Sequence, residues 1–480
     1  MSDILEGKPS CEVIENAKLP ANVDTFDETA NAAVNAALVR KQDMRIVPLC
    51  AMMYLLAYLD RSNIGNAKIM NQDQGKDLLS VTATSSYQYS ISLAVFLVAY
   101  TIFEIPANYF LKLMGPSKWF CVLMVSWGTI ASCMSAIENF GGLMATRFML
   151  GVFEAGLAPG LAYYITFWYR ANERSIRLAF IYSTATLAGA FGGALAYGIS
   201  HLNMARGIEG WRWLFIIEGL PSVIGGFIVL AFLPDYPEKT RFLKEEERQL
   251  AIARMEFNGS KGSAGNMTWA QARETLCDLR LYGHYIVYFS KSCPFSSLSL
   301  FTPSIVSGLG YGSVQAQLMT VPPYAAAFIT TLVAAYYSDK TGHRALFTIG
   351  LMLVGAAGFI ASAALPPDDY IARYICLIIC CMGTFATIPI LLGWLSANLH
   401  STSAQGLAIA LNISFGAPGQ ITGTWIYQDS EQQSGYPTGH WVNGALLLLG
   451  PALTGGLVVL YARRNRRIDR GLSDSPRWAL

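Results

Sequence analysis

An aspartate and an arginine, Asp60 and Arg61, stand side by side at the end of the first long apolar run, 46–59. Charges placed near the middle of a bilayer cost ~2.5–3.5 kcal/mol each on insertion scales, so they are retained for function or are paired. Adjacent residues of a helix point about 100° apart, which gives the two side chains different partners. Because a planar guanidinium matches a carboxylate bidentately, we predict that Arg61 binds an organic anion.

Three further charges, Glu104, Arg147 and Glu154, interrupt apolar segments of the first half. Arg147 and Glu154 lie two turns apart on one helix face, with Gly151 between them leaving room for a partner or a ligand. Desolvation disfavours the charged form of a buried glutamate, so we predict that Glu154 carries protons, the alternative being a hydrogen-bonded packing residue. Asp60 either forms a static ion pair with Arg147 or shares the proton role. Glu104 is expected to act in gating or in structure.

The composition indicates the elements that position these charges. Of the 480 residues, 53% are apolar and only 14% are charged, against about 25% charged in soluble domains. Runs near 20 apolar residues predict transmembrane helices, and twelve are found: 46–66, 86–112, 118–137, 141–166, 176–200, 212–234, 283–308, 315–337, 345–365, 371–395, 403–427 and 441–462. We therefore predict an all-α membrane protein with 12 transmembrane helices in two pseudo-symmetric six-helix bundles around a midplane site.

Lysine and arginine gather in alternate loops, which by the positive-inside rule places those loops and both termini in the cytoplasm. The loop 400–405 is an exception, since it has no basic residue. The predicted organisation is a cytoplasmic N-terminal tail (1–45), an N-terminal six-helix bundle (46–234), a cytoplasmic central loop (235–282), a C-terminal six-helix bundle (283–462) and a cytoplasmic C-terminal tail (463–480). Within the central loop, 240–256 has the capping and charge pattern of a surface helix. We expect a multi-pass protein of the plasma membrane.

A loop motif follows the eighth span. The segment 338–344 reads SDKTGHR, with Asp339 at the membrane edge, a turn at Gly342 and Arg344 two residues later. This pattern resembles the cytoplasmic loop motif of the major facilitator superfamily. The resemblance implies that Asp339 latches neighbouring helices in one state, and we assign Asp339 and Arg344 to ion pairing or gating. The equivalent loop after span two is degenerate, with Lys112 in place of the aspartate.

A narrower resemblance covers about 45–465. The motifs YLDRSNIGNA (58–67), FEIPANYFLK (103–112), RFMLGVFEAGLAPG (147–160), GWRWLFIIEGLPS (210–222) and LPDYPEKTRFL (233–243) are similar to the fungal anion:cation symporter branch. This is the allantoate permease-like group, with nicotinate- and pantothenate-type organic-anion permeases. The resemblance implies that Arg61 contacts a substrate carboxylate and that Asp60 and Glu154 carry protons. The sequence departs from the branch at 400–405, where relatives have a Lys-Arg pair.

The predicted function is proton-coupled uptake of a small organic anion by alternating access, driven by the proton gradient without a cofactor. Candidates for lining the pocket are Tyr54, Tyr58, Tyr163, Phe295, Trp394 and Asn398. Alternatives are a proton-antiport exporter of a metabolite or drug and, from another class, a nutrient sensor. The sequence carries no phosphate-binding loop, metal-ligand cluster or nucleophile–base set, so we expect no enzyme activity, no metal and no nucleic-acid partner. We expect a monomer whose partners are the anion, the proton and the lipid bilayer.

Overall fold

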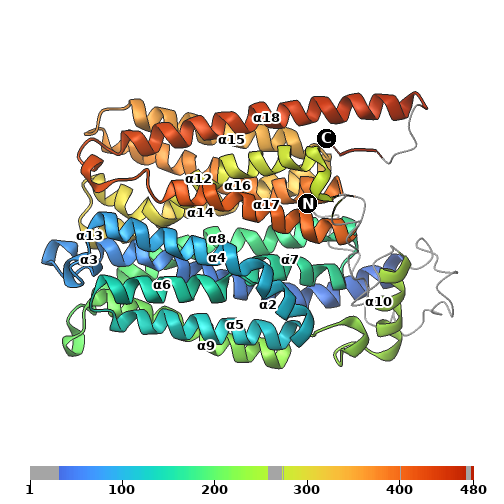
Figure 1. The fold of residues 1–480 in the computed structure, drawn as a ribbon, viewed down its shortest axis with the longest axis horizontal. Coiled ribbons are helices and arrows are strands. Elements are labelled where there is room, and N and C mark those ends of the chain that lie inside the picture. Colours follow the sequence, from blue (N-terminus) through green and yellow to red (C-terminus); the bar gives the residue numbers. More distant parts are fainter. Residues whose placement is uncertain (1–31, 258–272, 274, 400–401, 472–476, 480) are drawn as a thin grey trace, which may run out of the picture.

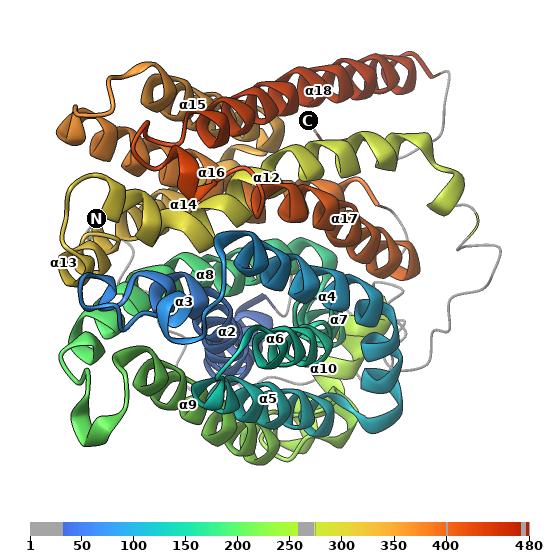
Figure 2. The same ribbon diagram turned by 60° about the vertical axis from the view of Figure 1, so that its left-hand side comes forward.

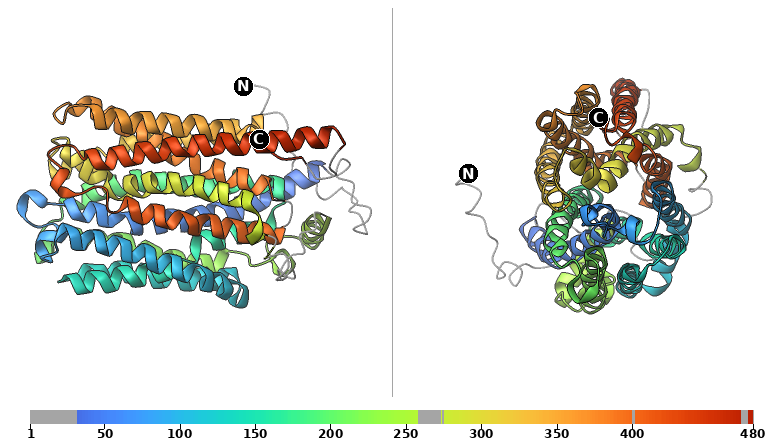
Figure 3. Two further views of the ribbon diagram at one scale, coloured as in Figure 1. Left: turned by 45° about the horizontal axis from the view of Figure 1, so that its top comes forward. Right: turned by 90° about the vertical axis from the view of Figure 1, so that its left-hand side faces the viewer.

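The computed structural model describes residues 32–257, 273, 275–399, 402–471 and 477–479. Within these ranges the chain forms long helices that run roughly parallel to one axis (Figure 1). Seen from two further directions, the helices from the first half of the chain (blue to green) and those from the second half (yellow to red) form two groups that lie side by side (Figures 2 and 3). The predicted all-helical fold with two six-helix bundles is confirmed.

The N-terminal bundle contains α2 (Ala32–Ile69), α4 (Ser86–Met114), α5 (Pro116–Cys133), α6 (Phe140–Glu154), α7 (Leu157–Trp168), α8 (Ala171–Ser200) and α9 (Gly210–Phe232). The C-terminal bundle contains α12 (Leu279–Gly308), α13 (Ser313–Leu318), α14 (Val321–Thr341), α15 (Arg344–Ala364), α16 (Tyr370–Ala397), α17 (Thr402–Gly423) and α18 (Pro437–Asp469). Short helices α3 (Leu78–Val81) and α10 (Glu245–Phe257) lie at opposite ends of the molecule (Figure 1). We call these two ends the α13 end, which also carries α3, and the α10 end.

The fourth span is broken into α6 and α7. Pro159 stands in the first turn of α7, and a proline removes the hydrogen bond to the carbonyl four residues earlier, here that of Ala155. The break therefore falls directly after Glu154, the last residue of α6. A carboxylate that the sequence places inside one continuous helix thus sits at a discontinuity in the middle of the span.

Nine helical segments of the described chain are long and apolar enough to cross a membrane by length and composition. The helices α2, α12 and α17 fall outside that set because polar residues interrupt them. These three helices supply Arg61, Lys291 and Gln420 to the centre of the molecule, so the least apolar helices contribute these three polar side chains of the site.

Glycines allow close approach where the two bundles meet. A Cβ on Gly193 of α8 would collide with Thr320, and one on Gly189 would meet the ring of Tyr324 in α14. On α2, a Cβ at Gly65 would overlap the backbone carbonyl of Leu300 in α12. Small residues at such positions let helix backbones touch in lipid. The glycine pattern of the fifth span therefore marks the contact between the bundles toward the α13 end.

Two expectations for the polar segments differ from the structure. The surface helix predicted over 240–256 begins only at Glu245, because the chain first makes a turn at Pro237–Lys239 and Glu247 accepts the backbone N–H of Lys244. The first helix, by contrast, starts at Ala32, well before the apolar run. The tail before residue 32 and the first two residues of the base-free loop, 400–401, lie outside the described residues.

Candidate functional site

A small closed cavity lies between the two bundles at mid-height. It is lined by aromatic and aliphatic side chains from both bundles together with Arg61, Lys291 and Gln420. Its volume is about 30 Å³, room for roughly two water molecules. The lining contains no acidic side chain from the described residues. An organic molecule enters this cavity only if the bundles move apart, which makes the arrangement an occluded one.

Arg61 reaches this cavity from α2 and crosses to the other bundle. Its Nη2 donates to Oε1 of Gln420 in α17 at 2.6 Å. The guanidinium carbon lies 5.0 to 5.7 Å from the ring centroids of Phe96, Tyr100 and Tyr58. Arg61 forms no ion pair with any described residue. A cation whose direct contacts are all neutral groups retains its capacity to bind an anion.

Asp60 points away from the cavity and does not meet Arg147, so the ion pair considered for these two residues is absent between them. Its Oδ2 accepts a hydrogen bond of 2.5 Å from Ser222 of α9, and its Oδ1 is buried without a partner. One turn along α2, Asn63 donates to Glu218, also on α9. Each of the two neighbouring carboxyl groups on the seam between α2 and α9 thus has one oxygen bonded to a neutral donor and one buried oxygen without a partner.

Arg147 and Glu154 lie on one face of α6, as their spacing predicts. The guanidinium of Arg147 packs 4.6 Å from the ring centroid of Phe96, and its Nε and Nη1 are buried without hydrogen bonds. Oε1 of Glu154 is also buried and unpaired, and the carboxyl interacts electrostatically with Arg61 first and with Arg147 less strongly. The gap at Gly151 is filled by the backbone of Phe96, so the partner there is α4 and not a ligand.

Glu104 connects the two bundles by a hydrogen bond and not by an ion pair. Its Oε2 accepts from the hydroxyl of Ser414 in α17 at 3.2 Å, while Oε1 is buried without a partner. The residue is 1% exposed. This contact is positioned to respond to relative movement of α4 and α17.

At the α13 end the bundles are joined by polar contacts. Lys68 pairs with Asp429 at 2.6 Å, and Asp73 accepts from the hydroxyl of Ser313 at 2.8 Å. Gln317 also donates to the backbone carbonyl of Asn66 at 3.0 Å. Beside the ion pair lies a pocket of about 310 Å³ whose walls include aromatic side chains. The polar contacts close the route from this end to the central cavity.

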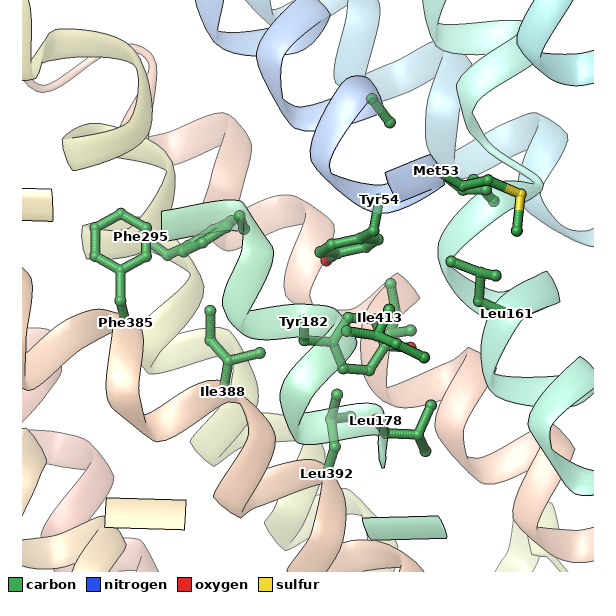
Figure 4. Close-up of a cluster of buried hydrophobic side chains, with 14 of the residues drawn as sticks. Met53, Tyr54, Leu161, Leu178, Tyr182, Phe295, Phe385, Ile388, Leu392 and Ile413 are labelled. Atoms are coloured by element: carbon green, nitrogen blue, oxygen red, sulfur yellow. The ribbon is translucent and has the colours of Figure 1, made fainter. Parts of the chain in front are cut away.

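Toward the α10 end the closure is apolar (Figure 4). Leu178 and Tyr182 of α8 lie beside Ile388 and Leu392 of α16, with Ile413 of α17 next to them. All five side chains are less than 10% exposed. The cavity is therefore sealed by charged and polar contacts on one side, and on the other by hydrophobic packing beside the hydrogen bond between Ser414 and Glu104.

The loop motif after α14 contains an ion pair. Arg344 binds Asp339 at 2.8 Å through Nη2, and its Nη1 donates to the carbonyl of Gly393 in α16 at 2.8 Å. Gly342 makes the turn with a φ of 72°. The pair thus fixes the ends of α14, α15 and α16 at the α10 end.

Trp394 and Asn398 do not line the cavity, which corrects their prediction as substrate-binding residues. Trp394 Nε1 donates to the backbone carbonyl of Ala479 at 3.0 Å, and Asn398 both donates to that carbonyl and accepts the N–H of Ala479. Asn465 binds the backbone of Trp478 in the same two-way manner. Both asparagines therefore hold the end of the chain, because a side-chain amide matches the donor and acceptor of one peptide residue.

Tyr163 also lies outside the cavity. Its ring packs against Phe167 at 4.7 Å between centroids and faces the ammonium of Lys112 at 5.4 Å. The other predicted pocket residues, Tyr54, Tyr58 and Phe295, do line the cavity. The residue of α7 that lines the cavity is Ala158, and Tyr163, five positions later, lies on a different face of that helix.

Sequence reasoning missed Lys291, Gln420 and Glu218. Lys291 lies in the middle of a long helix and is 1% exposed. It is the one lysine among the residues that line the cavity. The sequence did contain a signal for Lys291, because a lone lysine inside the seventh predicted span has the same free-energy cost of membrane insertion as Arg61. Glu218 lies within a quoted motif, but nothing in the spacing predicted its contact with Asn63.

Comparisons with known proteins agree with this architecture. The chain is 54% identical over 445 residues to the MFS transporter prlL of Fungal sp. (strain NRRL 50135), covering 92% of this chain and 90% of that protein. It is 31% identical over 439 residues to a protein of Agrobacterium vitis named "Putative tartrate transporter", covering 90% and 92%.

Two solved structures show the same fold at low sequence identity. The proton:xylose symporter XylE of E. coli has a TM-score of 0.64 and 16% identity, covering 86% of this chain and 95% of its own. A bacterial homologue of the human lysosomal transporter Spinster, in an inward-facing conformation, has a TM-score of 0.65 and 14% identity, covering 86% and 96%. The sequence profile of the Major Facilitator Superfamily matches residues 50–424. The chain belongs to the Major Facilitator Superfamily and is a multi-pass membrane transporter.

Proposed function

We propose that this transporter moves a small organic anion together with protons, and that Arg61 binds a carboxylate of the substrate. The observation that carries the proposal is the position of Arg61 in the closed central cavity, where its only hydrogen-bond partner among the described residues is the neutral Gln420. A guanidinium that forms no ion pair there has an unmet preference for an anion, and its planar donors suit a carboxylate.

Two lines of similarity support an organic acid as substrate. The relative from Agrobacterium vitis is named for tartrate, a dicarboxylate, and aligns over most of both chains. The motifs around Asp60 and Arg61 also resemble the fungal anion:cation symporter branch. The aromatic rings around the cavity favour a substrate with an apolar or unsaturated part.

Proton coupling rests on the buried carboxyl groups of the N-terminal bundle. Glu154 has an unpaired buried oxygen and interacts with Arg61, so its protonation and anion binding at Arg61 influence each other. Asp60 is a second candidate, held by Ser222. Intramembrane acids of this kind serve as proton relays in transporters. Glu104 accepts a hydrogen bond from Ser414 of the other bundle, so its protonation affects a contact between the two bundles.

For orientation we propose that the α13 end faces outward and the α10 end faces the cytoplasm of a cell whose plasma membrane holds the protein. The basic cluster at the end of α18, which includes Arg463, Arg464, Arg466 and Arg467, lies at the α10 end, as the positive-inside rule requires.

The test is uptake of labelled organic acids by cells or vesicles that contain the protein, measured at several external pH values. The proposal predicts faster uptake at lower external pH and loss of accumulation when a protonophore dissipates the gradient. Uptake whose rate and extent change neither with external pH nor with protonophore contradicts proton coupling. Absence of uptake for every carboxylate tested, with transport of a neutral compound, contradicts the assignment of an organic anion.

A further inference from the structure

A second cation faces the central cavity from the opposite bundle. Lys291 lies in the middle of α12 and is 1% exposed. Its ammonium is 3.9 Å from the ring centroid of Tyr288 and 5.0 Å from that of Phe295. It forms no ion pair with a residue in the described ranges. The contacts of this ammonium are thus made by aromatic faces.

Lys291 has aromatic contacts but no counter-ion among the described residues. A lysine at the centre of a membrane helix is costly to insert and is usually paired. The cation–π contacts attract the ammonium to the faces of two rings. Aromatic faces hold a cation without neutralising it, so the site remains able to bind an anion. Since Lys291 lines the cavity, that anion is one that enters the cavity.

The two cations belong to one enclosure. Arg61 lies over the ring of Tyr58 at 5.7 Å, the rings of Tyr58 and Phe295 contact at 6.0 Å between centroids, and Lys291 faces Phe295. The route from one cation to the other therefore runs along two aromatic rings. Arg61 comes from α2 and Lys291 from α12, so each bundle contributes one positive charge to the same cavity.

We infer that the substrate carries two anionic groups separated by an apolar or unsaturated core, with Arg61 binding one group and Lys291 binding the other. This inference rests on the proposed function and adds that Lys291 is the residue that selects dianions over monoanions. A dianion that contacts both cations connects the two bundles directly. Binding then favours closure of the two bundles around the ligand, because the ligand makes both contacts only when the bundles approach.

The experiment compares each dicarboxylate with its monoamide, which has nearly the same size and one charge less. The pairs are succinate and succinamate, tartrate and its monoamide, and isophthalate and 3-carbamoylbenzoate. Each compound is added to the purified full-length protein in lipid nanodiscs, and the ligand-induced rise in melting temperature gives the relative affinity. The variants are Lys291→Met and Lys291→Arg, with Arg61→Gln for comparison.

The inference predicts that the wild type binds at least one dicarboxylate ~10-fold or more tightly than its monoamide. Lys291→Met should reduce that ratio to about one while still binding the monoamide, and Lys291→Arg should restore the preference. Equal binding of acid and monoamide by the wild type, with monoamide affinity unchanged in Lys291→Met, overturns the inference and leaves the proposed function standing. If no acid or monoamide stabilises the wild type, the proposed function fails. If Lys291→Met does not fold, the wild type and Lys291→Arg still test the inference, because the inference predicts that both bind the dianion more tightly than the monoamide.

Discussion

Lys68 and Asp429 are 361 positions apart in the chain, yet the ammonium of one lies 2.6 Å from the carboxylate of the other. Lys68 lies in the last turn of α2 in the N-terminal bundle, and Asp429 stands in the loop between α17 and α18 of the C-terminal bundle. Ser86 at the start of α4 donates to the same carboxylate at 2.5 Å. This contact ties the bundles together at the α13 end, and it must break whenever that end opens.

Removing the lysine charge should open the α13 end. Lys68→Met leaves Asp429, whose side chain is 31% exposed, without its cation. The loss should shift the equilibrium away from the closed state by at least about 1 kcal/mol, because the lysine side chain is buried and that value is near the upper limit for fully exposed pairs. The readout is the thiol-labelling rate of a cysteine introduced at Ser90, which lines the adjacent pocket, in a background without native cysteines. We expect ~5-fold faster labelling in the variant. Lys76→Met, a lysine at the same end without an ion pair to a described residue, is the control. Equal rates in wild type and Lys68→Met contradict the role of this contact.

The same ion pair should not produce the pH dependence of transport. Partial burial acts to raise the pKa of Asp429, but Lys68 and the hydrogen bonds from Lys68 and Ser86 outweigh it and hold the pKa below the usual aspartate value. A lowered pKa means that the stabilisation is complete above the unperturbed pKa, about 3.9, and is lost only as pH falls through the lowered pKa. Asp429→Asn should therefore change the rate of uptake but not its relative pH profile between pH 5 and 7.5. A flattened profile in Asp429→Asn would place the pH sensor at this contact.

Glu154 should be needed for coupling but not for exchange. In Glu154→Gln the side chain keeps its size and loses its proton exchange, so we expect substrate counterflow to continue while uphill accumulation falls to the equilibrium level. Vesicles with an imposed pH gradient give both measurements. Glu138→Gln, an exposed acid of the N-terminal bundle, is the matched control and should accumulate substrate normally. Accumulation that survives in Glu154→Gln would transfer the role to Asp60 or Glu104.

The end of the chain should stabilise the C-terminal bundle. Trp478 stacks on Tyr461 with 5.5 Å between ring centroids and lies under the guanidinium of Arg280 at 4.2 Å. Trp478→Ala removes both contacts and should cost about 1–3 kcal/mol, seen as a lower melting temperature of the purified protein. Arg477→Ala, whose side chain is 71% exposed, should have little effect. If the two variants melt alike, the docked end contributes nothing to stability.

The sequence was most informative about the features that the bilayer constrains, which are the lengths of the spans and the positions of charged residues within them. About twenty apolar residues are needed to cross a membrane, so the spans could be predicted from composition alone. The cost of a buried charge singled out Arg61 and Glu154 in the same way. Contacts between side chains depend on how each helix is rotated and on which helix lies opposite, and the sequence does not contain that information directly. The Asp60 contact with Ser222 in place of Arg147 is an example.

Two other differences have the same physical origin. Asn398 is a candidate for the pocket by sequence, but residues 477–479 fold back and Ala479 binds its side chain. That contact joins segments that are distant in the chain and has no local pattern. Lys291 was overlooked although its charge was visible in the sequence, since only the structure shows that its helix faces Arg61 across one cavity.

The central claim is that Arg61 binds the carboxylate of an organic acid, and transport by purified protein in vesicles tests it most directly. Labelled tartrate, supplied with an inward proton gradient, is followed in wild type, Arg61→Lys and Arg61→Gln at equal protein content. Loss of a buried charge partner costs about 2–5 kcal/mol, so Arg61→Gln should lower the initial rate ~30-fold or more, and Arg61→Lys should retain part of it. Wild-type uptake of tartrate or another dicarboxylate that is unchanged in Arg61→Gln would contradict the account.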